Sequence, residues 1–230
     1  MNMLKYSGLT ILNIALFFVL LFSSVQVIST WDAYYRWHYH AHNIEETTAM
    51  DEENFMDVTD KMMDYLMGKR NSLDMEATID GQIQEVFGER EKAHMIDVKV
   101  LFQNGKFIRN ISALALSVFI LLSLIKWKKI FYEWIKSLKV FFITAFIIVV
   151  ALGTLFYFNF SKYFIVFHEL FFDNDLWLLD PKTDVLINMV PEIFFFQTTM
   201  LIVGLFVIMV IGTMILRKLL MNQMLKNWRA

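Results

Sequence analysis

The stretch "VFFITAFIIVVALGTLFYF", residues 140–158, decides the fold. It is rich in Phe, Ile, Val and Leu and carries no charged side chain. A helix needs roughly 20 such residues to cross the hydrocarbon core of a bilayer. The stretch therefore predicts a transmembrane helix.

Three other segments have the same character, namely residues 1–29, 108–126 and 193–216. We predict that the first is a retained helix and not a cleaved signal peptide. Its apolar run is longer than a typical signal core, and "SSVQVIST" is a poor cleavage site. The whole chain of 230 residues is 57% hydrophobic, with a mean hydropathy of +0.48, which is typical of a membrane protein.

The charges on the connecting segments predict the orientation. Basic residues dominate the link 127–139 and the tail 217–230, whereas segments 30–107 and 159–192 carry an excess of acids. The basic side chains in or next to this link and this tail are Lys126, Lys128, Lys129, Lys136, Lys139, Arg217, Lys218, Lys226 and Arg229. Positive charge favours the cytoplasmic side. We therefore predict cytoplasmic N- and C-termini and extracellular acidic segments.

Segment 30–107 is too long for a loop without structure of its own. "DEENFMDVTDKMMDYLMG", 51–68, predicts an amphipathic helix that Gly68 caps. "MEATIDGQIQEVF", 75–87, predicts a β-hairpin that turns at Asp80-Gly81. "GEREKAHMIDVKVLFQNG", 88–105, predicts a helix that closes at Asn104-Gly105. We thus predict an all-α membrane protein, a four-transmembrane-helix bundle with a small extracellular α/β cap domain.

The composition excludes several kinds of chemistry. With 0 Cys, the chain has neither a disulfide framework nor a thiolate nucleophile or metal ligand. It also has no G-x-S-x-G, no H-E-x-x-H and no Gly-rich phosphate loop. We expect no cofactor, no metal and no nucleic-acid partner.

His94 is one of two histidines placed beside carboxylates. Glu91 lies three residues before it and Asp97 three residues after it, so a helix puts all three on one face. A neighbouring carboxylate raises the basicity of an imidazole and fixes its orientation. A surface helix with charge pairs explains the same spacing.

His168 lies in "SKYFIVFHELFF", 161–172, which follows the third predicted span. The neighbouring aromatic side chains that could exclude water from it are Phe164, Phe167, Phe171 and Phe172. Exclusion of water favours the neutral imidazole that a general base needs. The acids that could orient it are Glu169, Asp173, Asp175 and Asp180. Taken alone, the stretch supports a structural and a catalytic histidine equally.

The remaining histidines cluster in "WHYHAH", 37–42. In an extended strand, His38, His40 and His42 would share one side, as in a zinc or nickel site. A convincing fourth ligand is missing from the sequence. The neighbouring Trp and Tyr residues favour a solvated stretch at the membrane edge instead.

Two stretches carry a resemblance to a known family. "REKAHMIDVKVLF", 90–102, and "FHELFFDNDLWLLDPKTDVLINMVPEIFF", 167–195, resemble the lipoprotein intramolecular transacylase (Lit) family of bacterial integral membrane proteins. The family has two essential histidines, which map onto His94 and His168. The resemblance implies a multi-pass protein of the bacterial plasma membrane with its active site at the extracellular face.

The resemblance also implies an activity. Members move an O-linked acyl chain of the diacylglyceryl group of a lipoprotein to the α-amine of its N-terminal Cys, which gives the lyso form. We expect His168 and His94 to share general acid/base catalysis and oxyanion stabilisation, with Asp97 or Glu91 orienting His94. The expected supporting and substrate-positioning residues are Asp97, Glu91, Arg90, Glu169, Asp173, Asp175 and Trp177.

The expected partners are a diacylated lipoprotein and membrane lipid, and we expect a monomer. Two other functions remain open at this point. One is a related membrane acyltransferase or hydrolase with another lipid substrate. The other is a non-enzymatic sensor whose extracellular domain binds a ligand.

Overall fold

A computed structural model describes the backbone of residues 2–126 and 128–229 and the side chains of residues 6–123, 125–126 and 128–226. Trp127 of the predicted cytoplasmic link and the side chain of Arg229 in the predicted tail lie outside the described residues.

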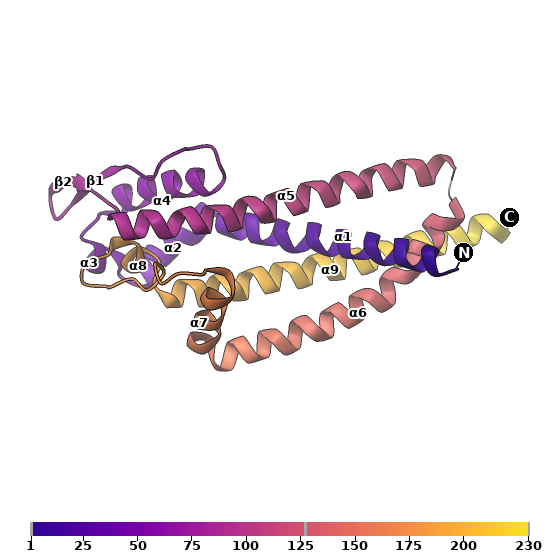
Figure 1. Cartoon of the computed structure of the whole chain (residues 1–230). Coiled ribbons are helices and arrows are strands. Elements are labelled where there is room, and N and C mark those ends of the chain that lie inside the picture. Colours follow the sequence, from indigo (N-terminus) through magenta and orange to yellow (C-terminus); the bar gives the residue numbers. More distant parts are fainter. Residues whose placement is uncertain (1, 127, 230) are drawn as a thin grey trace. The chain divides into compact units, whose positions relative to one another are not determined.

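Four long helices dominate the described chain (Figure 1). They are α1 (Asn2–Ser29), α5 (Glu89–Ile125), α6 (Lys128–Phe158) and α9 (Glu192–Arg229). Within the part of the chain that was described, these 4 helices are long and apolar enough to cross a membrane. The prediction of four helices with the length and composition of membrane spans is thus confirmed. At about 1.5 Å per residue, the 37 residues of α5 and the 38 of α9 exceed the thickness of the hydrocarbon core.

The chain forms two compact units. The helical unit contains the residues up to Val25, Lys106–Leu155 and the residues from Leu201 onward. The site unit contains Gln26–Gly105 and Phe156–Met200. Each of the four long helices, α1, α5, α6 and α9, contributes residues to both units. The long helices therefore supply the predicted spans and also part of the site unit.

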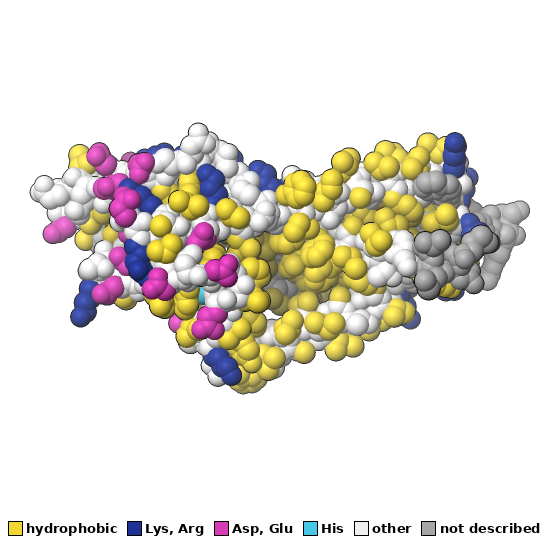
Figure 2. Space-filling view, viewed as in Figure 1, with side chains coloured by type: hydrophobic (Ala, Val, Ile, Leu, Met, Phe, Trp, Pro, Cys, Tyr) yellow, Lys and Arg dark blue, Asp and Glu magenta, His cyan; other side chains and the backbone are white. Residues whose placement is uncertain are grey.

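The helical unit has an apolar core and an apolar surface. Its buried members are Leu9, Leu20, Leu116, Trp134, Ile135, Leu138, Phe142, Phe206 and Val210. Hydrophobic side chains also cover the outside of these long helices, as Figure 2 shows. An apolar exterior over whole helices is what contact with lipid requires. One polar pair links two helices, because the Asn13 side-chain amide donates to the Ser137 hydroxyl at 3.1 Å.

The site unit is built from short elements. They are α2 (Asp32–Ala41), α3 (Ile44–Thr48), α4 (Glu52–Leu66), β1 (Glu76–Ile79), β2 (Gln82–Glu85), α7 (Phe160–Phe171) and α8 (Val185–Met189). Acidic side chains gather over this unit in Figure 2. The predicted amphipathic helix is α4, whose Phe55, Val58 and Met62 are buried. Gly68 follows it in the left-handed region at φ +77, as predicted for a cap.

The predicted hairpin is also present. Strands β1 and β2 pair antiparallel with Thr78 opposite Ile83. Asp80 and Gly81 form the turn at φ 51 and 71. Two consecutive residues with positive φ are the mark of a type I′ turn, which is why Asp-Gly is favoured there.

Two local predictions are wrong. The helix through His94 does not end at Asn104-Gly105, because α5 continues to Ile125. A Gly inside a helix costs only about 1 kcal/mol relative to Ala, and the apolar residues on both sides favour continuation. The interpretation of "WHYHAH" as a solvated stretch is wrong for His38, which is 0% exposed. The extended strand that a three-histidine metal site would need is also absent, because residues up to Ala41 belong to α2. In addition, segment 159–192 contains the helices α7 and α8.

Candidate active site

The site unit brings His94 and His168 together from two helices. His94 lies on α5 and His168 on α7, and their ring centroids are 6.1 Å apart. Both side chains are buried, with exposed fractions of 7% and 8%. The fold thus brings together two imidazoles that lie far apart in the sequence.

Local packing fixes the orientation of His168. Its Nδ1 atom lies 2.7 Å from the backbone carbonyl oxygen of Phe164. A carbonyl oxygen can only accept, so Nδ1 carries the proton and the Nε2 atom keeps a lone pair. The rings around the imidazole, with centroid distances of 4.3 to 5.6 Å, are those of Phe164, Phe167, Phe172 and Trp177.

These surroundings set the charge state of His168. Burial lowers the pKa of His168 below its ordinary value, and the hydrogen bond to Phe164 opposes this shift only in part. The imidazole is therefore neutral at pH 7. The sequence-based expectation of a desolvated His168 with a free basic nitrogen agrees with this arrangement.

His94 has a different environment. Phe172 packs edge-on against its ring at 5.3 Å. The buried Nδ1 atom has no hydrogen-bond partner among the described residues. A buried polar atom without a partner costs free energy. The atom is consequently available to a group that enters the site.

The segment after α7 contacts both α5 and His168. Asn174 donates its side-chain amide to Asp97 on α5 at 2.9 Å, and its side-chain oxygen accepts from the Leu176 N–H at 3.0 Å. Trp177, which stacks on His168 at 4.7 Å, donates its Nε1–H to the Asn174 carbonyl at 3.0 Å. Asn174 thus connects α5 to the aromatic cover of His168.

Arg90 makes a second connection between α5 and this segment. Its guanidinium donates to the Asp175 carbonyl oxygen and lies 3.4 Å from the Asp175 carboxylate. Both side chains are exposed. The positive charge of Arg90 is therefore directed at the segment and not at the histidine rings.

Glu91 holds a third contact. Its side chain is 1% exposed and accepts from the Gly88 N–H and from the Leu186 N–H, each at 2.6 Å. Both oxygens are thereby engaged with backbone groups, so the expected role of orienting His94 does not fall to Glu91. Glu91 also lines an open cavity of about 380 Å³ between the hairpin and Thr183.

The other sequence-based candidates are acids on α7 or directly after it. Glu169 and Asp173 are exposed, and Asp175 contacts Arg90. Sequence reasoning missed two groups, the carbonyl of Phe164 and the side chain of Asn174. The signal for Asn174 was present, because Asn and Asp commonly bond the backbone two residues on, as this side chain does in "DNDLW".

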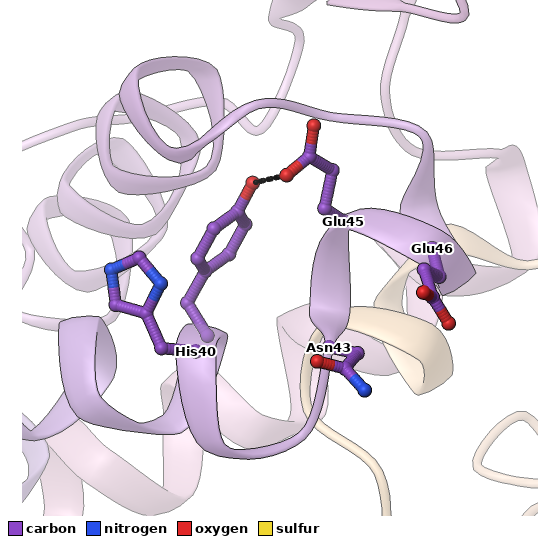
Figure 3. Close-up of a pocket in the computed structure, with 5 residues that line it drawn as sticks. His40, Asn43, Glu45 and Glu46 are labelled. Carbon is purple, nitrogen blue, oxygen red and sulfur yellow. Dashed lines mark hydrogen bonds between the residues drawn. The ribbon is translucent and has the colours of Figure 1, made fainter.

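The helical form of "WHYHAH" separates its three histidines. His38 and His42 are adjacent, with ring centroids 4.9 Å apart, whereas His40 pairs with Glu52 at 3.1 Å. His40 lines an open pocket of about 340 Å³ with Tyr39, Asn43, Glu45 and Glu46 (Figure 3). The dashed line there is the Tyr39 hydroxyl donating to Glu45 at 3.2 Å. Over the residues that the structure describes, no group of three or more His, Cys, Asp or Glu side chains is arranged to hold a metal ion.

Comparison with known proteins gives one consistent result. This chain is similar to the solved structure of the membrane integral lipoprotein intramolecular transacylase Lit from Bacillus cereus, with a TM-score of 0.76 and 21% sequence identity. The match covers 100% of this chain and 99% of the Bacillus cereus chain. Two variants of that protein, each with a substituted histidine, match with a TM-score of 0.72. No curated protein matches the chain.

These structural similarities establish a common fold of a membrane-integral protein. The family assignment rests on a separate comparison, with the family model described as lipoprotein intramolecular transacylase Lit. Residues 10–195, which include most of α1, all of α5 and α7, and the pair His94 and His168, match that model. The chain therefore belongs to the lipoprotein intramolecular transacylase family.

Proposed function

We propose that this acyltransferase moves an O-linked acyl chain of the diacylglyceryl group of a bacterial lipoprotein to the α-amine of its N-terminal Cys. The product is the lyso-form lipoprotein. The observation that carries the proposal is the pair of buried imidazoles, His94 and His168, with centroids 6.1 Å apart inside a chain of this family.

The substrate supplies both reactants. The α-amine nitrogen attacks the ester carbonyl carbon, an N–C bond forms, and the C–O bond to glycerol breaks. One proton leaves the nitrogen and one is delivered to the glycerol oxygen, so the step needs no co-reactant. A protein without Cys or a serine elbow suits this chemistry, because its task is to position the groups and move the proton.

His168 is the proposed general base and acid. Its Nδ1–H is directed at Phe164, so Nε2 is the nitrogen that accepts the proton from the amine and returns it to the departing oxygen. The aromatic rings around it exclude water, which favours transfer to the amine over hydrolysis of the ester.

His94 is the proposed partner of the carbonyl oxygen. In the tautomer with the proton on Nδ1, the unpartnered Nδ1–H can donate to the oxyanion that develops during attack. A donor that meets its partner only in the transition state lowers the barrier without tightening substrate binding.

Carboxylates near the pair are the proposed site for the substrate ammonium. Asp97 lies one turn after His94, and one of its carboxylate oxygens accepts a hydrogen bond from Asn174. Asp173 and Glu169 are exposed on the same segment as His168. Trp177 and Arg90 hold the segment over the site and act as positioning residues.

The proposal includes a location. The chain acts as a monomer in the bacterial plasma membrane, with its termini in the cytoplasm and the site unit at the extracellular face. The basic residues of the link and tail and the acidic surface of the site unit support this orientation. Membrane lipid and a diacylated lipoprotein are its partners.

The test is the conversion of diacylated lipoprotein in membranes that contain the enzyme. We expect His168→Gln and His94→Gln to reduce the formation of lyso-form lipoprotein by about 10²–10⁴-fold. The exposed His40→Gln is the matched control and retains activity. Mass spectrometry of the N-terminal lipopeptide reads the product.

Two outcomes would contradict the proposal. Either histidine variant could reach normal membrane levels and still convert the substrate at the wild-type rate. Alternatively, the wild-type enzyme could release free fatty acid from the lipoprotein without forming an N-acyl product, which would identify a hydrolase.

A further inference from the structure

Helix α7 presents faces of distinct character, each made of residues four positions apart. Phe164 and His168 form the face that is packed into the site unit. The exposed apolar face, which we call the α7 apolar face, consists of Val166, Phe167, Leu170 and Phe171. The polar face consists of Ser161 and Glu169, with Ile165 between them as its one apolar member, and Lys162 lies at the border with Val166.

The α7 apolar face is large for a surface in water. Leu170 is 74% exposed and Phe171 is 50% exposed, and Val166 and Phe167 adjoin them. Single exposed apolar residues need no explanation, but a contiguous patch on one helix face indicates contact with another apolar phase.

Connectivity identifies that phase. Helix α6 is a candidate membrane span that ends at Phe158, and α7 begins at Phe160, so only Asn159 separates them. Two residues of extended chain reach at most about 7 Å. The start of α7 is therefore held at the membrane surface from which α6 emerges, within reach of the acyl chains.

We propose that α7 lies in the membrane interface with its apolar face among the acyl chains, and that the substrate's acyl chain reaches His168 along this face. This pattern of one apolar and one polar face is that of a helix lying in the interface plane. The second half of the inference rests on the proposed function.

The position of His168 on α7 fits this arrangement. The stripe of Phe164 and His168 has the apolar stripe of Phe167 and Phe171 on one side and the polar stripe of Ser161 and Glu169 on the other. A helix that lies with its apolar face in lipid places such a boundary residue at the level where hydrocarbon meets headgroup. The ester carbonyls of a diacylglyceryl group occupy that level.

The natural absence of Cys allows a direct test. Single Cys residues introduced as Val166→Cys and Leu170→Cys on the apolar face, and as Ser161→Cys and Glu169→Cys on the polar face, carry a nitroxide label. The protein is placed in vesicles of phosphatidylethanolamine and phosphatidylglycerol. Accessibility to oxygen, which concentrates in hydrocarbon, is compared with accessibility to a water-soluble nickel chelate.

We expect the labels at 166 and 170 to be several-fold more accessible to oxygen than to nickel, and the labels at 161 and 169 to show the reverse. Equal exposure of positions 170 and 169 to the nickel chelate would overturn the placement of α7. All positions are exposed in the structure, so the labels disturb little packing.

Activity in the same vesicles tests the route of the acyl chain. We expect Leu170→Glu to lower lyso-lipoprotein formation at least tenfold and Leu170→Met to leave it within twofold. Normal activity of Leu170→Glu would overturn the route. If wild-type enzyme forms no lyso product while the accessibility pattern holds, the proposed function fails and the placement of α7 stands.

Discussion

The Nδ1 atom of His168 lies 2.7 Å from the carbonyl oxygen of Phe164, one turn earlier on α7. The helix itself thereby selects the tautomer of its histidine, because the carbonyl can bond only to a protonated nitrogen. Many catalytic histidines receive this orientation from a carboxylate, which also raises their basicity. Here a neutral carbonyl orients the ring, so the imidazole stays neutral and its free nitrogen remains a moderate base.

The pH dependence of the proposed reaction follows from this arrangement. Burial lowers the pKa of His168 below the ordinary value of about 6.5, so the base is already neutral at and above that pH. The α-amine of the substrate, with an ordinary pKa of about 7.7–8.0, must lose a proton before it attacks. We expect log kcat/KM to rise with a slope of one between pH 6 and 7 and to level above about pH 8.

Initial rates of lyso-lipoprotein formation in buffered vesicles measure this profile. Two protonations below pH 6.5 would give a slope approaching two, and that result would show an ordinary or raised pKa for His168. A substrate with a blocked amine serves as the control and forms no product at any pH.

The hydrogen bond between Asn174 and Asp97 predicts coupling between these residues. The Asn174 amide donates to the Asp97 carboxylate at 2.9 Å and positions the segment that bears Trp177. We expect Asn174→Ala and Asp97→Ala each to lower kcat/KM. Each substitution removes the same contact. The loss of transition-state stabilisation in the double variant is therefore smaller than the sum of the two single losses, by about 0.5–1 kcal/mol for this partly exposed pair.

A double-mutant cycle on kcat/KM measures this coupling, with the exposed Glu53→Ala replacing Asn174→Ala in a control cycle. Full additivity of the Asn174 and Asp97 effects would mean that the contact does not hold the segment in the working enzyme.

The sequence predicted this site unevenly, for physical reasons. The hairpin at Asp80-Gly81 and the amphipathic α4 were predictable because turn chemistry and apolar periodicity are local. The pairing of His94 with His168 followed from the family resemblance and not from spacing. The extension of α5 beyond Gly105 was missed, because the tendency of Asn-Gly to end a helix was overridden by its context. The contact of Glu91 with Leu186 spans 95 positions and leaves no local pattern.

Through that contact the Glu91 side chain links α5 to α8. Its two oxygens accept from the N–H groups of Gly88 and Leu186, and the side chain is buried. Gln at this position has one acceptor oxygen and would point an N–H at one of these donors. We expect Glu91→Gln to reduce the free energy of unfolding by about 1–3 kcal/mol.

Thermal or denaturant unfolding of the purified protein in detergent measures this change. The matched control is Glu89→Gln, whose side chain is 94% exposed and is expected to change stability by less than about 0.5 kcal/mol. Equal stability of the Glu91→Gln variant and the wild type would show that the link between α5 and α8 through Glu91 does not stabilise the protein.

His38 predicts a stability effect that is independent of catalysis. The side chain is 0% exposed, and neither ring nitrogen has a hydrogen-bond partner among the residues that are described. Burial, and to a lesser extent the neighbouring His42, lowers the pKa of His38 to about 4. The nearby Met189 backbone opposes this shift only in part, because it lies outside hydrogen-bond geometry. Replacing such a ring with a similar apolar side chain removes unpaired polar atoms from the interior.

The sign of the pH effect follows from the two states. The unfolded chain binds a proton at His38 below about pH 6.5, whereas the folded protein does so only below about pH 4. The contribution of neutral His38 to the free energy of unfolding is thus fully present above pH 6.5 and is lost as the pH falls from 6.5 towards 4. We expect His38→Leu to equal or exceed the wild type at pH 7 and to lose less stability between pH 6.5 and 4, by on the order of 2–3 kcal/mol. Unfolding at a series of pH values measures the difference, with the exposed His40→Leu as the control. An unchanged acid sensitivity of His38→Leu would show that the ring is solvated or paired in the folded protein.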